Sequence, residues 1–262
     1  MKVILLGAGK LGKQLYKSFV NNQTIDLIQW YNRSETNLIS PEGIALTNSL
    51  DAIEKADLYI LAVSDDVISS ISKKLPTDVL LIHTAGSVSM DVMKSHKRRG
   101  VWYPIQSFND QQEIDFSEVT FGIETNKLSD KQLIYELTKS IEAKPIDINS
   151  EQREKLHLAA VIVNNFINHL FTQASLFCED NELSFDLLRP LIRETFNKID
   201  EISPQKAQSG PAIRNDKNTL KRHLELIKNP VLKKVYSSLT TAIQKHHLNE
   251  KIYTFITLYQ NI

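Results

Sequence analysis

Over the first 150 residues, short apolar runs alternate with amphipathic stretches, which is the pattern of β-strands and α-helices that follow one another. The N-terminal run, residues 1–6, is rich in branched apolar side chains and predicts a buried parallel strand. Further strands are expected at residues 26–31, 43–47, 56–63, 79–84, 100–103, 120–124 and 144–148, and helices at 13–19, 51–55 and 129–143, the last capped by Ser129. The pattern predicts an α/β domain with a mostly parallel sheet.

From residue 151 onward only helical periodicity is found. The expected helices span residues 151–179, 184–201, 216–228, 230–246 and 249–260, with one extended loop at 203–212. Ser150, Asp216 and Asn249 are plausible N-caps, and Pro230 fits a helix start. The chain is therefore expected to hold two domains, an α/β domain over residues 1–150 and an all-helical domain over residues 151–262.

A glycine motif at residues 7–12 follows the first strand and precedes a helix. Strand, Gly-x-Gly-x-x-Gly and helix, in this order, hold a dinucleotide pyrophosphate in Rossmann-type domains. Gly7 is expected to permit the tight turn, Gly9 to let the backbone approach the phosphates, and Gly12 to let the helix pack closely. The expected cofactor contacts here are Gly7, Ala8, Gly9, Lys10, Leu11 and Gly12. The alternative is a glycine turn that binds nothing.

The end of the second strand bears on the choice of dinucleotide. NAD-binding domains place Asp or Glu about 20 residues past the glycines, on the ribose 2′-hydroxyl. This chain has Asn32, Arg33 and Ser34 there, a cation and hydrogen-bond donors that suit a 2′-phosphate. We therefore expect NADP(H) to be preferred over NAD(H). The alternative is that Arg33 is a solvated turn residue.

Two further strand ends should lie at the same carboxyl edge of the sheet, where α/β folds bind ligands. The cofactor contacts expected there are Val63, Ser64, Asp65, Thr84, Ala85 and Gly86. Asp65 and Asp66 have the residue type of a metal-binding pair, but adjacent acids before a helix are more often N-caps, and no metal site is expected. His83 lies inside a strand, and a structural role is favoured for it over a catalytic one.

Composition narrows the class of protein. Thirty-one basic and 31 acidic residues give zero net charge, which argues against a nucleic-acid partner. Cys178 is the only cysteine, so an intrachain disulfide is impossible and a cytoplasmic location is favoured. The N-terminus runs straight into the first strand, so no signal peptide is expected. The longest apolar run, residues 158–163, is far shorter than the roughly 20 residues that span a membrane.

The helix expected at 151–179 carries the candidate chemistry. At 3.6 residues per turn, His157, Asn164 and Asn168 share one stripe, with Asn165 at its flank, and the other faces are apolar and expected to be buried. This stripe suits a cleft between the two domains, or else its side chains satisfy one another inside the helical domain. Histidine titrates near neutral pH, so His157 is the preferred proton donor, and Asn164 or Asn165 would orient the acceptor.

Arg214 and Asp216 follow a Gly-Pro pair and are candidates for binding a charged substrate group. An equally plausible interpretation is that Asp216 caps a helix and that Arg214 is its local partner.

Three motifs give the chain a family resemblance. They are Tyr103–Phe108, where the family tends to have His-Pro-x-Gln-Thr-Phe; His157–Ala160 with Asn165–Phe166; and Ser209–Asp216, where it tends to have Gly-Pro-x-x-Arg-Gly-Asp. With these motifs the chain resembles a bacterial family that pairs a Rossmann-type domain with a helical domain of unknown function (DUF 2520), within the superfamily of 6-phosphogluconate dehydrogenase and pyrroline-5-carboxylate reductase.

The resemblance implies an NADP-dependent oxidoreductase and a homodimer formed through the helical domain. It also makes Gln106, Ser107 and Phe108 candidate substrate contacts. Two positions depart from the family pattern, because Tyr103 replaces a histidine and Asn215 replaces a glycine. A proton-transfer role at position 103 would therefore have to be phenolic or absent.

Three functions follow from these observations. The first is an NADPH-dependent reductase of a small carbonyl or imine metabolite. The second is a non-catalytic NADP(H)-binding sensor or partner-binding protein. The third is a dehydrogenase that oxidises a hydroxy acid or a prephenate-like acid, with Arg214 holding the carboxylate.

Overall fold

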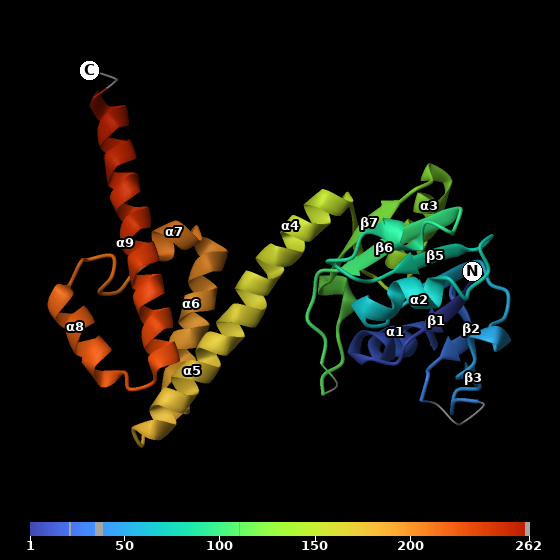
Figure 1. Cartoon of the computed structure of the whole chain (residues 1–262), viewed down its shortest axis with the longest axis horizontal. Coiled ribbons are helices and arrows are strands. Elements are labelled where there is room, and N and C mark those ends of the chain that lie inside the picture. The colour runs from blue at the N-terminus through green and yellow to red at the C-terminus, as the bar shows by residue number, and fades with distance from the viewer. Residues whose placement is uncertain (21, 35–38, 110, 260–262) are drawn as a thin grey trace. The chain divides into compact units, whose positions relative to one another are not determined.

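The apolar run at the N-terminus forms strand β1 (Lys2–Leu6), an interior strand of the sheet, in the computed structural model of the chain (Figure 1). The structure describes residues 1–20, 22–34, 39–109 and 111–259, with side chains up to residue 248. The chain divides into two compact units, Met1–Ile167 and Asn168–Ile262.

Within the described residues, eight strands form one sheet in the order β3-β2-β1-β4-β5-β6-β7-β8. The strands after β1 are β2 (Asp26–Tyr31), β3 (Ala45–Thr47), β4 (Leu58–Leu61), β5 (Leu80–His83), β6 (Arg98–Pro104), β7 (Thr120–Thr125) and β8 (Lys144–Asp147). All neighbouring pairs are parallel except β6 and β7, which are antiparallel. The expected α/β, Rossmann-type, mostly parallel sheet is confirmed.

In the described part of the chain, three α-helices lie between the strands in sequence, namely α1 (Lys10–Val20), α2 (Ile68–Ser72) and α3 (Leu128–Ser140). Two local expectations are wrong. The helix expected at 51–55 is a short 3-10 turn, η1 (Leu50–Ala52). Ser129 is not the N-cap of α3, because the helix already begins at Leu128, with Lys127 at the cap position.

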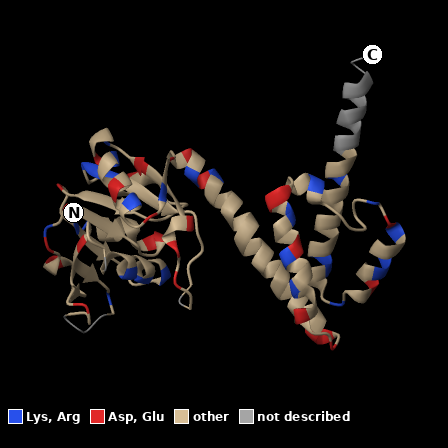
Figure 2. Ribbon diagram, turned by 180° about the vertical axis from the view of Figure 1, so that it is seen from behind, with Lys and Arg blue, Asp and Glu red and all other residues tan. Residues whose placement is uncertain are grey.

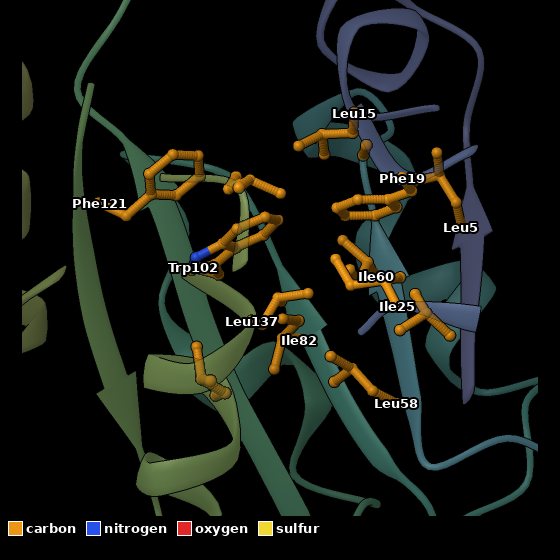
Figure 3. Packing of buried hydrophobic residues seen from close by; sticks show 14 of the residues in the cluster. Leu5, Leu15, Phe19, Ile25, Leu58, Ile60, Ile82, Trp102, Phe121 and Leu137 are labelled. Atoms are coloured by element: carbon orange, nitrogen blue, oxygen red, sulfur yellow. The ribbon is translucent and has the colours of Figure 1, made fainter. Parts of the chain in front are cut away.

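Side chains alternate across the sheet and build a core on each of its faces. Along β1, Val3 and Leu5 belong to one apolar cluster and Ile4 and Leu6 to the other. In the larger cluster the indole of Trp102 stacks on another aromatic ring, that of Phe121, at a centroid distance of 4.3 Å (Figure 3). Burial on both faces explains why the strands read as continuous apolar runs.

The segment after β8 is helical throughout, in α4 (Ser150–Ala160), the π-helical turn η5 (Val161–Phe166) and α5 (Ile167–Asp180). The N-cap of α4 is Asn149, which forms a capping box with Gln152, so the expectation that Ser150 caps this helix is wrong by one residue.

The second unit continues with η6 (Phe185–Leu188), α6 (Arg189–Glu201), α7 (Pro204–Ala207), α8 (Lys217–Leu226) and α9 (Pro230–Tyr259). Two expectations fail here. Helix α9 is continuous, so no new helix starts at Asn249, and the loop expected at 203–212 contains the short helix α7. Within the described part of the chain, no helix combines the length and apolarity needed to cross a membrane.

Candidate dinucleotide and substrate site

The three glycines of the loop between β1 and α1 have three different surroundings. Gly7 has φ +116°, and a Cβ there would collide with the carbonyl of Ala62. A Cβ at Gly12 would collide with the carbonyl of Gly7, so this glycine lets the helix pack on the loop. At Gly9 no described atom lies within 4 Å of the Cβ position. The open side of the loop is therefore at Gly9, where a phosphate would approach.

The start of α1 faces the same space. The N–H of Lys13 donates to the carbonyl of Gly9 at 2.9 Å, so the amides before it precede the first intrahelical hydrogen bond. Such amides, together with the helix dipole, favour an anion at this end of the helix.

A cavity of about 610 Å³ extends from the glycine loop along the carboxyl edge of the sheet. The expected cofactor residues that line it are Gly7, Ala8, Gly9, Lys10, Leu11, Asn32, Arg33, Ser34, Val63, Ser64 and Thr84. The expected residues Gly12, Asp65, Ala85 and Gly86 are not among its lining residues. Sequence reasoning missed Tyr31, Leu50, Ala62, Val67, Ser70, Ile71 and Lys74, which also line it.

The electrostatic character of this cavity is cationic. Lys10, Arg33 and Lys74 line it, and none of the described lining residues carries a carboxylate. Lys74 lies just beyond α2, and no signal in the glycine motif or in the second strand points to it. A prediction of helix over residues 67–74 would have identified Lys74, because that helix has Val67, Ser70, Ile71 and Lys74 on one face.

Asp65 has a local structural role in place of the expected cap. It begins a 3-10 turn, η2 (Asp65–Val67), whose N-cap residue Ser64 makes no side-chain capping bond. The hydroxyl of Ser87 donates to the carboxylate of Asp65 at 2.6 Å. The pair ties the loop after β4 to the loop after β5, and the capping role expected for Asp65 and Asp66 is wrong. In the described parts of the chain, no three His, Cys, Asp or Glu side chains gather as a metal-binding group.

A second group of side chains lies where α4 meets the sheet. Arg153 is only 1% exposed, pairs with the carboxylate of Glu124, and donates to the carbonyl of Val88 at 2.6 Å. These contacts hold the first turns of α4 against β7 and the loop after β5. Sequence reasoning missed Arg153, because a buried cation is not expected on a helix with the composition of a solvated one.

One turn further along α4, His157 lies against Gly86 and Tyr103. The hydroxyl of Tyr103 is 3.2 Å from Nδ1 of His157, and a Cβ at position 86 would stand 2.6 Å from the same nitrogen. Gly86 follows Thr84, which lines the cavity, by two residues. Gly86 therefore makes room for the imidazole.

His83 is fully buried at the end of β5 and accepts a hydrogen bond at Nδ1 from the N–H of Ala85. Burial, and secondarily the charge of Arg153, lowers the pKa of His83 to about 4. The side chain is therefore neutral near pH 7 and acts as part of the core, as its position inside a strand suggested.

The predicted polar stripe on this helix is wrong in its geometry. The π-helical turn η5 bonds each residue to the fifth before it, so the spacing of 3.6 residues does not hold between His157 and Asn164. The apolar faces are not buried either, because Leu158, Val163 and Phe166 are 59%, 63% and 57% exposed. Asn164 and Asn165 both lie in the π-helical turn, a feature often found at functional sites.

The remaining candidates have mixed surroundings. Gln106 and Ser107 are exposed just after β6, whereas Phe108 packs against the larger core cluster. Asp216 caps α8 by accepting from the N–H and hydroxyl of Thr219, as the structural interpretation predicted. Arg214 is exposed and belongs to the second unit, as does Asp216.

The sheet, the glycine loop and the cationic cavity together define a Rossmann-type dinucleotide-binding protein. The model of the domain of unknown function DUF2520 matches residues 119–243, so this domain includes the last two strands as well as helices. A comparison with curated proteins finds no significant match.

Solved structures are similar over nearly the whole chain. A Bacteroides fragilis protein, described as a candidate NADP oxidoreductase, is 33% identical, with 93% of this chain and 98% of that chain covered and a TM-score of 0.81. A Thermotoga maritima protein is 21% identical, with 95% and 99% covered and a TM-score of 0.71. The Plasmodium falciparum pyrroline carboxylate reductase with NADP bound is 14% identical, with 93% and 98% covered and a TM-score of 0.60. The chain belongs to the same family as the Bacteroides fragilis protein, and it carries a DUF2520 domain.

Proposed function

We propose that this protein is an NADP(H)-dependent oxidoreductase that reduces a small carbonyl or imine compound. The cavity at the glycine loop carries this proposal, because it joins an open Gly9, the start of α1 and three cations. A dinucleotide with a pyrophosphate and a 2′-phosphate carries anionic groups that match these cations. The descriptions of the similar structures as an NADP oxidoreductase and a pyrroline carboxylate reductase with NADP bound agree with it.

The preference for NADP(H) over NAD(H) rests on the end of β2. Asn32, Arg33 and Ser34 line the cavity there, where an NAD-specific domain would place a carboxylate. We assign Arg33 to the 2′-phosphate, because a guanidinium can bind two phosphate oxygens at once.

Bound NADPH supplies a hydride, and the chain must then supply a proton and hold the acceptor. The hydride would go to the carbonyl or imine carbon and the proton to its oxygen or nitrogen, which gives an alcohol or amine and NADP⁺. We assign the proton donor to His157, since it lies against Gly86 beside the cavity lining. Asn164, Asn165 and Gln106 are proposed to orient the acceptor, and Ser107 to bind its polar groups.

Two measurements test this function. Fluorescence titration should show tighter binding of NADPH than of NADH, and Arg33→Ala should weaken NADPH binding about tenfold without changing NADH binding. Absorbance of NADPH should fall during turnover of a panel of carbonyl and imine compounds. His157→Ala should then lower kcat about a hundredfold. The exposed His169, whose contact is with Gln173 on α5, offers the control variant His169→Ala.

Each arm has an outcome that contradicts it. Equal affinity for the two dinucleotides would remove the role of Arg33. Tight NADPH binding without turnover across the panel would identify a non-catalytic binding protein, and reduction of NADP⁺ by hydroxy acids alone would identify a dehydrogenase. Unchanged kcat in His157→Ala would remove the proposed proton donor.

We further propose that the protein is a homodimer and that the helical region forms its interface. Residues 156–178 contain no Lys, Arg, Asp or Glu, and Figure 2 shows this stretch without charge colours. Its exposed apolar side chains Leu158, Ile162, Val163 and Phe166 are more than a single chain normally leaves in contact with water. Light scattering should give twice the chain mass, and Val163→Glu should lower it. A wild-type monomer would refute the proposal.

Cys178, a buried free thiol, is in keeping with a cytoplasmic location.

A further inference from the structure

Tyr103 and His157 form a hydrogen-bonded pair between β6 and α4. The phenolic oxygen is 3.2 Å from Nδ1, and the rings meet edge to face at a centroid distance of 5.9 Å. The ring of Tyr103 also lies against Gly86, since a Cβ there would stand 2.7 Å from its Cε2. The hydrogen bond with Tyr103 thus fixes one edge of the imidazole, and the lack of a side chain at Gly86 leaves the space that the ring occupies.

The direction of this hydrogen bond follows from the surroundings of Tyr103. The side chain is buried, and this burial raises the pKa of its phenol, so the hydroxyl keeps its proton. In the part of the chain that the structure describes, Nδ1 of His157 is the one hydrogen-bond partner of this hydroxyl. A buried hydroxyl donates wherever an acceptor is available, because an unmet donor is unfavourable.

A hydroxyl can donate to Nδ1 only when that nitrogen carries no proton of its own. A neutral His157 that accepts from Tyr103 must therefore carry its proton on Nε2. The backbone beneath the ring is fixed, since Arg153 on the preceding turn of α4 is held by Glu124 and by the carbonyl of Val88.

We infer that Tyr103 is a positioning residue that fixes the tautomer of His157, so that Nε2–H is the hydrogen-bond donor that the imidazole presents to a ligand. The inference rests on the proposed function only for the identity of that ligand, the carbonyl oxygen or imine nitrogen of the substrate, which the Nε2–H of the neutral ring would polarise by a hydrogen bond. The proton itself would be transferred from the imidazolium form of His157, in which both ring nitrogens carry hydrogen and Nδ1–H donates to the phenolic oxygen of Tyr103. The pairing itself is a property of the free protein.

The tautomer can be measured directly in the full-length protein by two-bond ¹H–¹⁵N correlation spectra, recorded at alkaline pH, where imidazoles are neutral. The variant His157→Gln identifies the signals of His157. We expect a protonated Nε2 and an unprotonated Nδ1 in the wild type. In Tyr103→Phe, which removes only the hydroxyl, we expect both tautomers to be populated.

The second unit offers a matched control. The hydroxyl of Tyr236 lies 2.8 Å from Nδ1 of His223, with the rings again edge to face. Tyr236→Phe should alter the signals of His223 and leave those of His157 unchanged.

A proton on Nδ1 of His157 in the wild type would overturn the inference, as would an Nε2–H population that stays the same in Tyr103→Phe. With an active enzyme, Tyr103→Phe should also lower kcat about tenfold and leave the Kd for NADPH unchanged. The spectra need no turnover, so failure of the proposed oxidoreductase activity and failure of the tautomer assignment can be told apart.

Discussion

The indole N–H of Trp30 donates a hydrogen bond of 2.8 Å to the carbonyl oxygen of Gly7. Trp30 is on β2 and stacks on Tyr16 of α1 at a centroid distance of 4.2 Å. One side chain therefore connects the glycine loop, the strand before the proposed 2′-phosphate site and the helix whose N-terminus faces the cavity. The orientation of the first glycine is set by a residue outside the motif.

Trp30→Phe should weaken NADPH binding about fivefold, because it removes one hydrogen bond of about 1 kcal/mol to the loop and keeps an aromatic ring for Tyr16. Calorimetric titration measures the change. Tyr16→Phe is the control, since its hydroxyl contacts Ser40 and Glu42 and not the loop. Equal losses in both variants would show that the bond to Gly7 is not what matters.

Gly7→Ala and Gly9→Ala should fail in different ways. At Gly7 the new methyl group meets the carbonyl of Ala62 in a backbone conformation with positive φ, so the melting temperature should fall by several degrees. At Gly9 the methyl group enters empty space, so stability should be unchanged and NADPH binding should be lost. Thermal melts with and without NADPH separate the two effects. A destabilised Gly9→Ala with normal binding would contradict the role of Gly9.

Lys74→Ala should lower the affinity for NADPH roughly tenfold, as expected for loss of a charge-assisted contact with a phosphate. Lys73→Ala is the matched control, because Lys73 is the neighbouring exposed lysine and does not line the cavity. The difference between the two variants should shrink as salt is added. Equal Kd values for both variants would exclude Lys74 from the site.

His83 should make the folded state sensitive to acid. The unfolded chain takes up a proton near the ordinary pKa of 6.5, whereas folded His83 does so only at about 4. Between these values the unfolded state binds more protons, so stability falls as the pH falls, by on the order of 1 kcal/mol per pH unit from this group. Urea unfolding across this window should show a flatter pH dependence for His83→Asn than for the wild type. The same slope in both would contradict the prediction, and His169→Asn should keep the wild-type slope.

The strands and the glycine loop could be predicted because the residues that determine each of them are adjacent in the sequence. A parallel strand buried on both faces must be apolar along its whole length, as in residues 3–6, and the turn at Gly7 needs a positive φ that glycine tolerates best. That Arg33 lines the cavity was likewise predictable, since its spacing from the glycines places the end of β2 at the same edge of the sheet.

The features that could not be predicted depend on contacts between residues that are far apart in the sequence. Apolar residues 158–163 fit an α-helix, and nothing in their order marks the π-helical turn that shifts Asn164. Asp65 has the residue type of a cap, but a better partner, Ser87, comes from another loop. The site of Lys74 and the pairing of Arg153 with Glu124 appear only once the sheet brings their elements together.

The reversed direction of β7 has a consequence for the placement of His157. Ser150 at the start of α4 donates to Glu124, which is paired with Val101 of β6, while His157 reaches Tyr103, two residues further along the same strand. The seven residue steps of helix from Ser150 to His157 correspond to a rise of about 10 Å. The imidazole is thus placed by a count of residues from a fixed start, and one residue inserted before it would turn it by about 100° away from Gly86. Residues on the solvent-facing side of these two helical turns can therefore be substituted, whereas an insertion or a deletion within the turns would displace His157.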